Sequence, residues 1–500
     1  MLDALFINIT NPSQNYQALS TNLSAIEPPI WASMLTQALE NFGWNTDILD
    51  ADAKELSPQL IAEKIIKDYK NTRLVVFVVY GQQPSASTQN MPAALETFKY
   101  VRELDPNQHI MFLGLHPSAL PEQTFIDMVN IQPKNCFTNN IYVCRGEGIL
   151  ALNELLKTGS PYGIPGLYFN NTSDGRSFLP PPTPLDNLDK YLPGMPWHKL
   201  PMEKYRAHNW HCNFEPLENR KPYASLYTSL GCPYHCNFCC INAPFGKPSY
   251  RCWSSDHLIG EFDILAEKYN VKHIKFADEL FVLKPSRTIE LCNKMIERKY
   301  NFNIWAYARV DTCRPELLEK LKEAGVNWLC LGIESSNTEI RRGMSKGAFK
   351  ETDIHSIVKR IKSFDISVLG NYIFGLPTDT EETMQQTLDL ANELQCEYSN
   401  FYSAMAYPGS QLHKLKENKK YLPENNNVGW IGYSQLSRYC LPLPTEALSA
   451  KQVLTFRDSA FIKYYNNPHY LNMVRNKFGD VAITGIKQML SVPIKRSILS

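Results

Sequence analysis

Three cysteines lie close together in the middle of the chain, Cys232, Cys236 and Cys239, at C-x3-C-x2-C spacing. The preceding residues, 223–229, favour a β-strand, and Gly231 disfavours continuation into a regular helix. A loop at this place can turn three sulfur atoms towards one centre. Iron–sulfur clusters are held by cysteine thiolates, usually four of them. Three ligands on a four-iron cluster would leave one iron open to a substrate or a cosubstrate.

Zinc is the alternative occupant of this loop. A C-x2-C pair such as Cys236 and Cys239 also occurs in redox dithiols and in zinc sites. A structural zinc ion needs a fourth ligand. The residues that could supply it are Cys240, His235, Cys252, Cys212 and His211. Spacing alone leaves the cluster and the zinc ion both open.

The loop resembles the signature of the radical S-adenosylmethionine (SAM) superfamily, in which the same cysteine spacing carries a 4Fe–4S cluster. Phe238 occupies the place before the last cysteine where that superfamily favours an aromatic residue. The resemblance implies that the amino and carboxylate groups of SAM bind the open iron. It also implies that one electron from the cluster cleaves SAM to methionine and a 5′-deoxyadenosyl radical.

Length and composition limit the number of domains, the kinds of partner and the cellular location of the protein. Five hundred residues exceed a single hydrophobic core and predict two or three domains. Lys and Arg (51) balance Asp and Glu (50), so no overall basic field predicts binding to nucleic acid or to an anionic membrane. The sequence has neither a signal-peptide pattern nor an apolar run of membrane-spanning length. With thirteen cysteines in addition, we expect a cytoplasmic protein with free or metal-bound thiols.

Residues 1–155 alternate strand patterns with helix patterns. The predicted strands are 5–10, 46–50, 74–80 and 109–115. Helical spacing of apolar residues follows Pro29 and continues to Gly43, and a second helix begins at Ser57. The alternation predicts an α/β fold with a doubly wound, Rossmann-like sheet. Ligands of such sheets lie beyond the carboxyl ends of the strands.

This region is similar to the cobalamin-binding domain that precedes many radical SAM domains. The matching segments are residues 27–30, the Ser/Thr-rich loop after Tyr80, residues 114–121 and residues 146–148. The cobalamin contacts that the resemblance implies are Gln82, Ser85, Ser87, Thr88, Gly114, His116, Gly146, Glu147 and Gly148. One alternative stays open, a Rossmann-like module that binds nothing.

The first domain departs from other cobalamin folds at the cobalt ligand. Those folds carry a D-x-H-x-x-G motif whose histidine ligates cobalt, whereas residues 50–55 contain no histidine. Within the radical SAM branch this absence is common. His116 could substitute for that histidine, but we expect it to have a structural or supporting role.

Residues 156–215 form a proline-rich connector, in which the Leu-Pro-Pro-Pro-Thr-Pro run at 179–184 excludes a helix or a central strand. From 216 to 420 the strand–helix alternation resumes. The predicted strands there are 223–229, 271–277, 303–308, 327–333, 368–374 and 398–404. Six such units predict a partial (β/α)6 barrel with its active site at the carboxyl ends of the strands.

The radical SAM resemblance assigns residues at these strand ends. The implied SAM contacts are Phe238, Asp278, Glu279, Arg309, Glu334 and Gly375. Asp278 and Glu279 occupy the place of a Gly-Gly-Glu motif that holds the SAM amino group, although Ala277 and Asp278 replace both glycines. A guanidinium such as that of Arg309 is suited to a carboxylate.

Residues 421–500 predict a small helical cap whose main helix is capped by Ser449. Cys440 and nearby aromatic residues could line the substrate space, and Cys440 is the single weak candidate for a catalytic residue. Simple packing is the competing interpretation. The pair Arg457 and Asp458 lies within the predicted helix and is interpreted as a solvated face.

Taken together, the chain resembles a cobalamin-dependent radical SAM enzyme. The resemblance implies three cofactors (a 4Fe–4S cluster, SAM and cobalamin), an electron donor of the flavodoxin or ferredoxin type, and methylation of an unactivated carbon. A small molecule is the default substrate, and the sequence predicts no oligomeric state. Three alternatives remain: cyclisation or rearrangement with the same cofactors, a radical SAM enzyme with a vestigial first domain, and a zinc-stabilised binding or scaffold protein.

Overall fold

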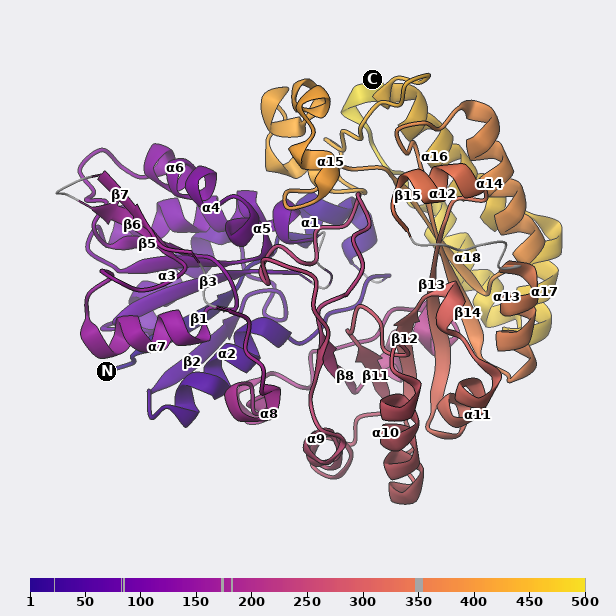
Figure 1. Ribbon diagram of the computed structural model, residues 1–500, viewed down its shortest axis with the longest axis horizontal. Coiled ribbons are helices and arrows are strands. Elements are labelled where there is room, and N and C mark those ends of the chain that lie inside the picture. The colour runs from indigo at the N-terminus through magenta and orange to yellow at the C-terminus, as the bar shows by residue number, and fades with distance from the viewer. Residues whose placement is uncertain are drawn as a thin grey trace.

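The computed structural model describes residues 1–21, 23–81, 83, 86–171, 175–180, 183–346 and 354–499. They form two lobes, each built on a sheet (Figure 1). The first lobe extends from β1 to β7, and the barrel lobe from β8 to the C-terminus. No helix in the described ranges combines the length and the apolar character needed to cross a membrane.

The first lobe contains a seven-stranded sheet of order β2-β1-β3-β4-β5-β6-β7. Its strands are β1 (Ala4–Asn8), β2 (Thr46–Asp50), β3 (Leu74–Val79), β4 (Ile110–Gly114), β5 (Ile141–Cys144), β6 (Leu167–Asn171) and β7 (Gly175–Phe178). The first five strands pair in parallel, which confirms the predicted doubly wound sheet. All six residues of β3 are buried, as expected for an apolar central strand covered on both faces.

Helices cover both faces of this sheet (Figure 1). They are α1 (Pro12–Tyr16), the 3-10 helix η1 (Gln17–Ser20), α2 (Ile30–Asn41), α3 (Pro58–Asp68), α4 (Ala86–Leu104), α5 (Leu115–Ala119), α6 (Pro121–Ile131) and α7 (Ile149–Thr158). Ser57 caps α3 through Leu60 N–H, as the sequence predicts. Strands β6 and β7 lie in the predicted connector and extend the sheet as an antiparallel hairpin.

The remaining described residues of the connector cross between the lobes and contain no strand. Their short helices are α8 (Leu188–Tyr191), η2 (Trp197–Lys199) and η3 (Trp210–Cys212), and η4 (Leu217–Arg220) follows before β8. Trp210 is buried against Trp305 and Trp328 of the barrel, at ring-centroid distances of 5.3 and 5.2 Å. The connector therefore supplies part of the barrel core.

The barrel lobe contains six parallel strands of order β15-β14-β13-β12-β11-β8. They are β8 (Tyr223–Leu226), β11 (His273–Phe276), β12 (Asn303–Ala308), β13 (Val326–Glu334), β14 (Ser367–Phe374) and β15 (Tyr398–Ser403). The helices between them are α9 (Ser255–Glu267), α10 (Pro285–Arg298), α11 (Pro315–Glu323), α12 (Thr338–Gly343), α13 (Ile354–Ser363) and α14 (Glu381–Leu394). The predicted six-unit partial barrel is confirmed, and β8 and β15 are its two edges.

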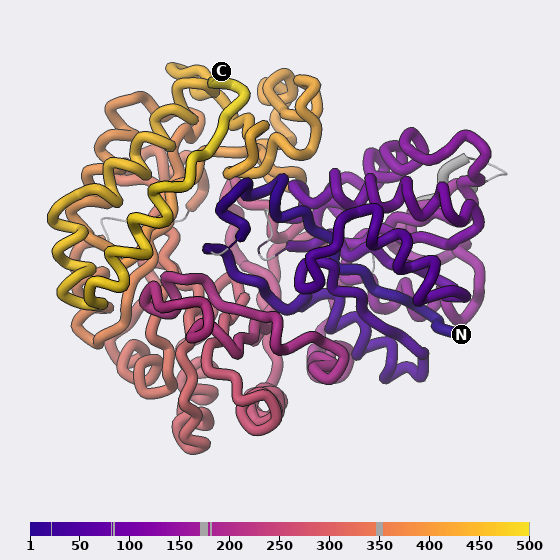
Figure 2. Tube along the Cα trace, turned by 180° about the vertical axis from the view of Figure 1, so that it is seen from behind, coloured from indigo at the N-terminus to yellow at the C-terminus, as the bar shows by residue number. Residues whose placement is uncertain are grey.

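The C-terminal region is helical, as predicted. It contains α15 (Gln411–Lys414), η6 (Lys416–Tyr421), η7 (Pro423–Asn425), η8 (Trp430–Tyr433), α16 (Ala450–Tyr465), α17 (Pro468–Phe478), α18 (Asp480–Ser491) and η9 (Ser497–Leu499). Ser449 and Gln452 form a capping box at α16. The last three α-helices run along the outer side of the barrel, in yellow in Figure 2. Trp430 instead reaches the first lobe, where its indole N–H donates to Asp127 Oδ2 over 2.8 Å.

Side chains from this region bind the free backbone edge of β15. Tyr465 OH donates to Ser399 O over 2.8 Å and accepts from Ser399 N–H over 3.0 Å. Arg457 Nε donates to Phe401 O over 2.7 Å, and Gln435 both donates to and accepts from the backbone of Ser403. An open strand edge leaves backbone groups unpaired. These side chains take the place of the missing next strand.

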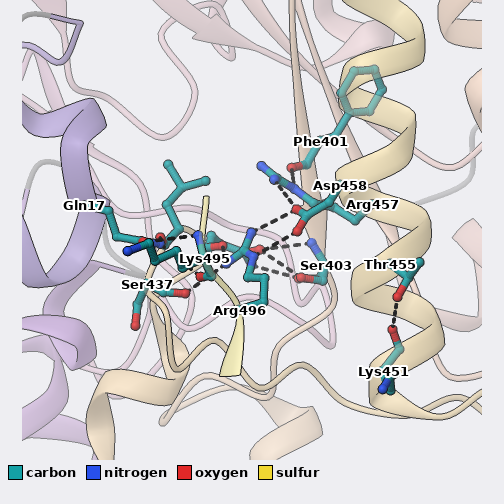
Figure 3. Close-up of polar contacts among 12 residues, drawn as sticks. Gln17, Phe401, Ser403, Ser437, Lys451, Thr455, Arg457, Asp458, Lys495 and Arg496 are labelled. Atoms are coloured by element: carbon teal, nitrogen blue, oxygen red, sulfur yellow. Dashed lines mark hydrogen bonds and ion pairs between the residues drawn. The ribbon is translucent and has the colours of Figure 1, made fainter. Parts of the chain in front are cut away.

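This arrangement corrects one sequence-based interpretation. Arg457 and Asp458 are not a solvated face, since Arg457 is only 6% exposed and bound to β15. Asp458 lies between Arg457 and Arg496, and Arg496 donates to both of its oxygens over 2.9 Å (Figure 3). Burial alone would raise the pKa of Asp458, but the bonds and charges of the two arginines hold it below its usual value.

A buried ion pair joins the two lobes. Lys275 Nζ of β11 donates to Glu27 Oε2 over 2.9 Å, and Tyr223 OH donates to Glu27 Oε1 over 3.1 Å. The two charged residues are 3% and 4% exposed. Removing one partner of a buried pair leaves an uncompensated charge, which costs about 3–5 kcal/mol.

We therefore predict that Lys275→Met lowers the urea midpoint of unfolding strongly, and that Glu27→Gln added to it restores part of the loss. Lys320→Met, which removes one member of the exposed Lys320–Glu323 pair, is the control and leaves the midpoint unchanged. Urea titrations followed by circular dichroism measure the difference. Equal midpoints for Lys275→Met and the control would show that the pair does not join the lobes.

Candidate functional site

The three-cysteine loop lies between two short antiparallel strands, β9 (Ser229–Leu230) and β10 (Arg251–Cys252), at the carboxyl end of β8. Gly231 has a φ of +84°, and a Cβ there would lie 2.6 Å from Ser249 O. Only glycine fits this turn without strain. The loop is also held from outside, because Asn237 N–H donates to Met344 O and Asn237 O accepts from Leu412 N–H.

The cysteines share one electrostatic neighbourhood. Cys239 N–H donates to Cys236 O over 3.0 Å, which closes a tight turn between them. Burial raises the pKa of the Cys236 thiol, while the cationic groups of Lys346 and Arg309 lower it. Burial likewise raises the pKa of Cys232 to about 11, with smaller contributions from Glu279 and Cys236. Two cationic side chains lie beside the loop, because Arg309 lies over the ring of Tyr234 and Lys346 over the ring of Phe238.

The described residues contain no three His, Cys, Asp or Glu side chains that converge tightly enough to hold one metal ion. They therefore give no support to the structural zinc site. A four-iron cluster makes a different demand, because each of its cysteine ligands binds a separate iron. The three cysteines lie on one loop, between β9 and β10, and can each present one thiolate.

Glu334 and Lys346 form a buried ion pair beside the loop. Glu334 has a left-handed backbone, with φ +64°. A Cβ at Gly332 would lie 2.5 Å from the Glu334 carboxylate and 2.6 Å from Lys346 Nζ. Glycine at 332 therefore leaves room for the pair. Lys346 also lies over the ring of Phe238, 5.7 Å from its centroid.

The two acidic residues after β11 differ in what they bind. Asp278 is fully buried and accepts from Thr228 N–H and Oγ1–H, both over 2.6 Å, and from Ser229. Glu279 has a buried Oε1 without a hydrogen-bond partner. Burial, and then the charge of Asp278, raises the pKa of Glu279 to about 8. Asp278 therefore supports the start of the cysteine loop, and Glu279 can receive a cationic ligand.

The other predicted SAM residues are bound to the protein. Arg309 donates from Nε and a terminal nitrogen to Asp311 over 3.0 and 3.2 Å, and its guanidinium lies 3.8 Å from the centre of the Tyr234 ring. Gly375 N–H donates to Asp379 over 3.0 Å. A Cβ at Gly375 would lie 2.3 Å from Val453 Cγ1, so this glycine lets α16 approach β14.

A cavity of about 490 Å³ opens at the carboxyl ends of β1 and β3. In the order β2-β1-β3, these neighbours mark the switch point where doubly wound sheets bind ligands. Trp31 stacks on Tyr80 in its wall with 4.5 Å between ring centroids, and Tyr227 of the barrel lobe meets Trp31 edge-on. The Tyr80 hydroxyl is buried without a hydrogen-bond partner. An aromatic wall with an unsatisfied polar group fits part of a large ring-bearing cofactor.

The predicted cobalamin residues that the structure describes follow β3, β4 and β5 and do not belong to the walls of this cavity. Ser87 donates to Val79 O and accepts from His116 N–H, and Thr88 contacts His116 Nδ1 at 3.2 Å. A Cβ at Gly114 would lie 2.1 Å from Val79 O. Burial lowers the pKa of His116 to about 3. These contacts connect the segments after β3 and β4.

Three further predicted residues stabilise the end of β5. Gly146 N–H donates to Ser118 over 3.0 Å, and Gly148 begins α7 with φ +83°. Glu147 pairs with Arg251 at 2.8 Å and accepts from Leu185 N–H, so it joins the first lobe to the connector and to β10. Gln82 and Ser85 lie outside the described residues.

A second cavity, of about 400 Å³, lies inside the barrel. Its walls include Tyr307 and Cys330 from neighbouring strands and Lys275 of the inter-lobe pair. Tyr16 and Ser24 line both cavities, and Glu27 lines the first. The two cavities are thus adjacent. Cys440 is 1% exposed and does not belong to the walls that the described residues give to either cavity.

Sequence reasoning missed several of these wall residues. Tyr16 in α1 and Trp31 in α2 follow β1, Asp52 follows β2 and Tyr80 follows β3, whereas the prediction concentrated on the loops after β3, β4 and β5. The strand order, once inferred, points to β1 and β3. Lys346 was missed as the partner of Glu334, because it follows α12 and carries no motif.

Comparison with known proteins agrees with both lobes. Residues 226–391 match the radical SAM superfamily, and residues 16–156 match the B12 binding domain. An uncharacterized methyltransferase of Pyrococcus horikoshii is 28% identical over 452 residues, which cover 89% of each chain. An anaerobic magnesium-protoporphyrin IX monomethyl ester cyclase of Rubrivivax gelatinosus is 25% identical over 80% of this chain and 68% of its own length.

Solved structures share the fold of the whole chain. The methyltransferase TsrM of Kitasatospora setae, with cobalamin and a 4Fe–4S cluster bound, superposes with a TM-score of 0.63 at 20% identity, covering 84% of this chain and 76% of TsrM. OxsB, with aqua-cobalamin and SAM bound, gives 0.65 at 14% identity over 98% and 72%. The chain therefore joins a B12-binding domain to a radical SAM domain and belongs to the cobalamin-dependent radical SAM enzymes, whose cofactors are a 4Fe–4S cluster, SAM and cobalamin.

Proposed function

We propose that this enzyme transfers a methyl group to a carbon atom of a small molecule held in the barrel cavity. The adjacency of the two cavities carries the proposal, since Tyr16 and Ser24 line both of them. A substrate in the barrel would face the B12-binding lobe, which contributes Tyr16 and Ser24 to the cavity wall. The P. horikoshii relative, named a methyltransferase, supports the same reaction.

When bound, the reduced cluster and SAM would supply a 5′-deoxyadenosyl radical for hydrogen abstraction, and cobalamin would carry the methyl group. The protein supplies ligands and orientation. In the proposal, Cys232, Cys236 and Cys239 each hold one iron. The nearby cationic groups of Arg309 and Lys346 stabilise the negative charge of these thiolates.

Glu279 is the proposed acceptor for the SAM amino group, because an ammonium would satisfy its unpartnered Oε1. Asp278 then acts as a positioning residue that holds Thr228 and Ser229, where the cysteine loop begins. Phe238 of the cysteine loop and Glu334 at the end of β13 both contact Lys346. Gly375 shapes the contact with α16.

An external electron donor of the flavodoxin or ferredoxin type is also part of the proposal. Pro233 and His235 in the cysteine loop are exposed. A small redox protein can therefore approach the loop from solvent. The exposure of these two residues supports this route.

We predict that Cys232→Ala abolishes iron retention after anaerobic reconstitution, because three cysteine ligands are the minimum for the proposed site. Cys240→Ala removes the neighbouring buried thiol and is the matched control, which keeps its iron. Iron analysis and the visible absorption of the cluster measure both. Loss of iron in Cys240→Ala with retention in Cys232→Ala would refute the ligand assignment.

The reaction itself is tested with SAM that carries a trideuteromethyl group. Reduced, reconstituted enzyme is incubated with pools of small molecules, and the products are examined by mass spectrometry. We expect a product heavier by one trideuteromethyl group, together with 5′-deoxyadenosine and S-adenosylhomocysteine. Reconstituted Glu279→Gln should form far less 5′-deoxyadenosine, by about ten- to a hundredfold, because it loses the charged acceptor.

Cyclisation or rearrangement is the second candidate function, favoured by the ester cyclase of R. gelatinosus among the relatives. It predicts 5′-deoxyadenosine and a changed substrate, without S-adenosylhomocysteine and without deuterium in the product. That result would replace the methyl-transfer proposal.

A further inference from the structure

The walls of the barrel cavity are rich in aromatic rings. They come from both lobes and include Tyr16 of α1, Trp305 and Tyr307 of β12, Tyr402 of β15 and Phe461 of α16. Flat rings on several sides favour a flat apolar ligand, which gains contact area and ring-stacking interactions.

The charged groups of the walls are compensated by the protein. Lys275 pairs with Glu27 at 2.9 Å, Arg457 pairs with Asp458 at 2.7 Å, and Asp458 also binds Arg496. His208, a further wall residue, is held neutral because burial, followed by the charges of Lys275 and Arg220, lowers its pKa to about 3. A charged ligand group would therefore be buried without a dedicated partner, which costs free energy.

The segment after α18 contributes to the wall of this cavity. Val492, Pro493 and Ile494 form part of its wall and follow directly on α18. The next residues hold them there. Gln17 of the first lobe donates to Lys495 O and accepts from Lys495 N–H, each over 3.2 Å.

Arg496 fixes this terminal segment most firmly. It donates twice to Asp458 and once each to Gln435 O and Ser437 O, all over 2.9 Å (Figure 3). Its side chain is 2% exposed. Bidentate arginine–carboxylate pairs are geometrically specific as well as strong. The position of residues 492–494 is thus set by bonds to both lobes.

We infer that the substrate of this enzyme is a compact, flat and uncharged molecule, and that residues 492–494 set the upper limit of its size. The inference rests on the proposed function, which requires a substrate in the barrel cavity, and it adds the chemical class of that substrate. A volume of about 400 Å³ is near the lower end of the range for small-molecule sites, about 300–1,000 Å³. One or two fused rings fit this space, whereas a tetrapyrrole exceeds it.

Binding of matched probes to the reconstituted enzyme tests the class. Indole-2-carboxamide and indole-2-carboxylate have nearly the same size and shape, and only the second is charged. Isothermal titration calorimetry should show at least tenfold tighter binding of the carboxamide. A neutral porphyrin dimethyl ester should not compete with it. Tighter binding of the carboxylate, or competition by the porphyrin ester, would overturn the inference.

Variants locate the binding. Ile494→Trp fills the cavity and should weaken carboxamide binding at least tenfold, whereas Val481→Trp on the exposed face of α18 should leave it unchanged. Asp458→Asn removes the charge that compensates Arg457 and Arg496, so it should raise the affinity for the carboxylate. If Ile494→Trp leaves the affinity for the carboxamide unchanged and Asp458→Asn leaves the affinity for the carboxylate unchanged, the probes bind outside this cavity and the inference is wrong.

These outcomes are separate from those of the methyl-transfer test. If the carboxamide binds as described but no trideuteromethyl product forms from any pool, the proposed function fails while the cavity class stands. If a charged or macrocyclic molecule is methylated, the class fails while the proposed function stands.

Discussion

The open edge of the barrel is the constraint on which much of the structure depends. A six-stranded parallel sheet that does not close leaves the backbone of β15 without a neighbouring strand. Tyr465, Arg457 and Gln435 bind that backbone instead. The C-terminal region therefore completes the hydrogen bonding of the barrel edge, in addition to covering the barrel. Because Arg457 also holds Asp458, and Asp458 holds Arg496, the same edge positions the end of the chain over the barrel cavity.

A second constraint is the fixed relation between the lobes. The Glu27–Lys275 pair, supported by Tyr223, connects residues 248 positions apart in the sequence at the boundary between two cavities. A buried pair of this kind stabilises little in comparison with an apolar contact, but its geometry is specific. Gln17 and Trp430 add further bonds across the same boundary. The cofactor-binding lobe and the barrel are thus held face to face, as a reaction between two bound groups requires.

Local patterns predicted the fold well. The strand at 74–79 is a continuous apolar run, and Ser57 and Ser449 are caps whose partners lie three residues away, so short windows of sequence contain the information. The cysteine spacing and Phe238 likewise form a local motif. The position of the cavity of about 490 Å³ depends on β1 and β3 being neighbours, a non-local property of the sheet that no short window of sequence contains.

Long-range partners explain the remaining differences. Arg457 and Asp458 resemble an exposed helical pair until β15 and Arg496 are brought beside them. Asp278 and Glu279 are adjacent acids whose difference arises from Thr228 and Ser229, about fifty residues earlier. Lys346 joins Glu334 only through the fold. None of these pairings follows from spacing or residue type.

Pulsed electron paramagnetic resonance can show whether one chain holds a cluster and a corrinoid on facing surfaces. The enzyme is reconstituted anaerobically with iron, sulfide and hydroxocobalamin and then reduced. We expect one cobalt and about four irons per chain, with magnetic coupling between the reduced cluster and Co(II). Iron without retained cobalt, or two centres without measurable coupling, would contradict this expectation.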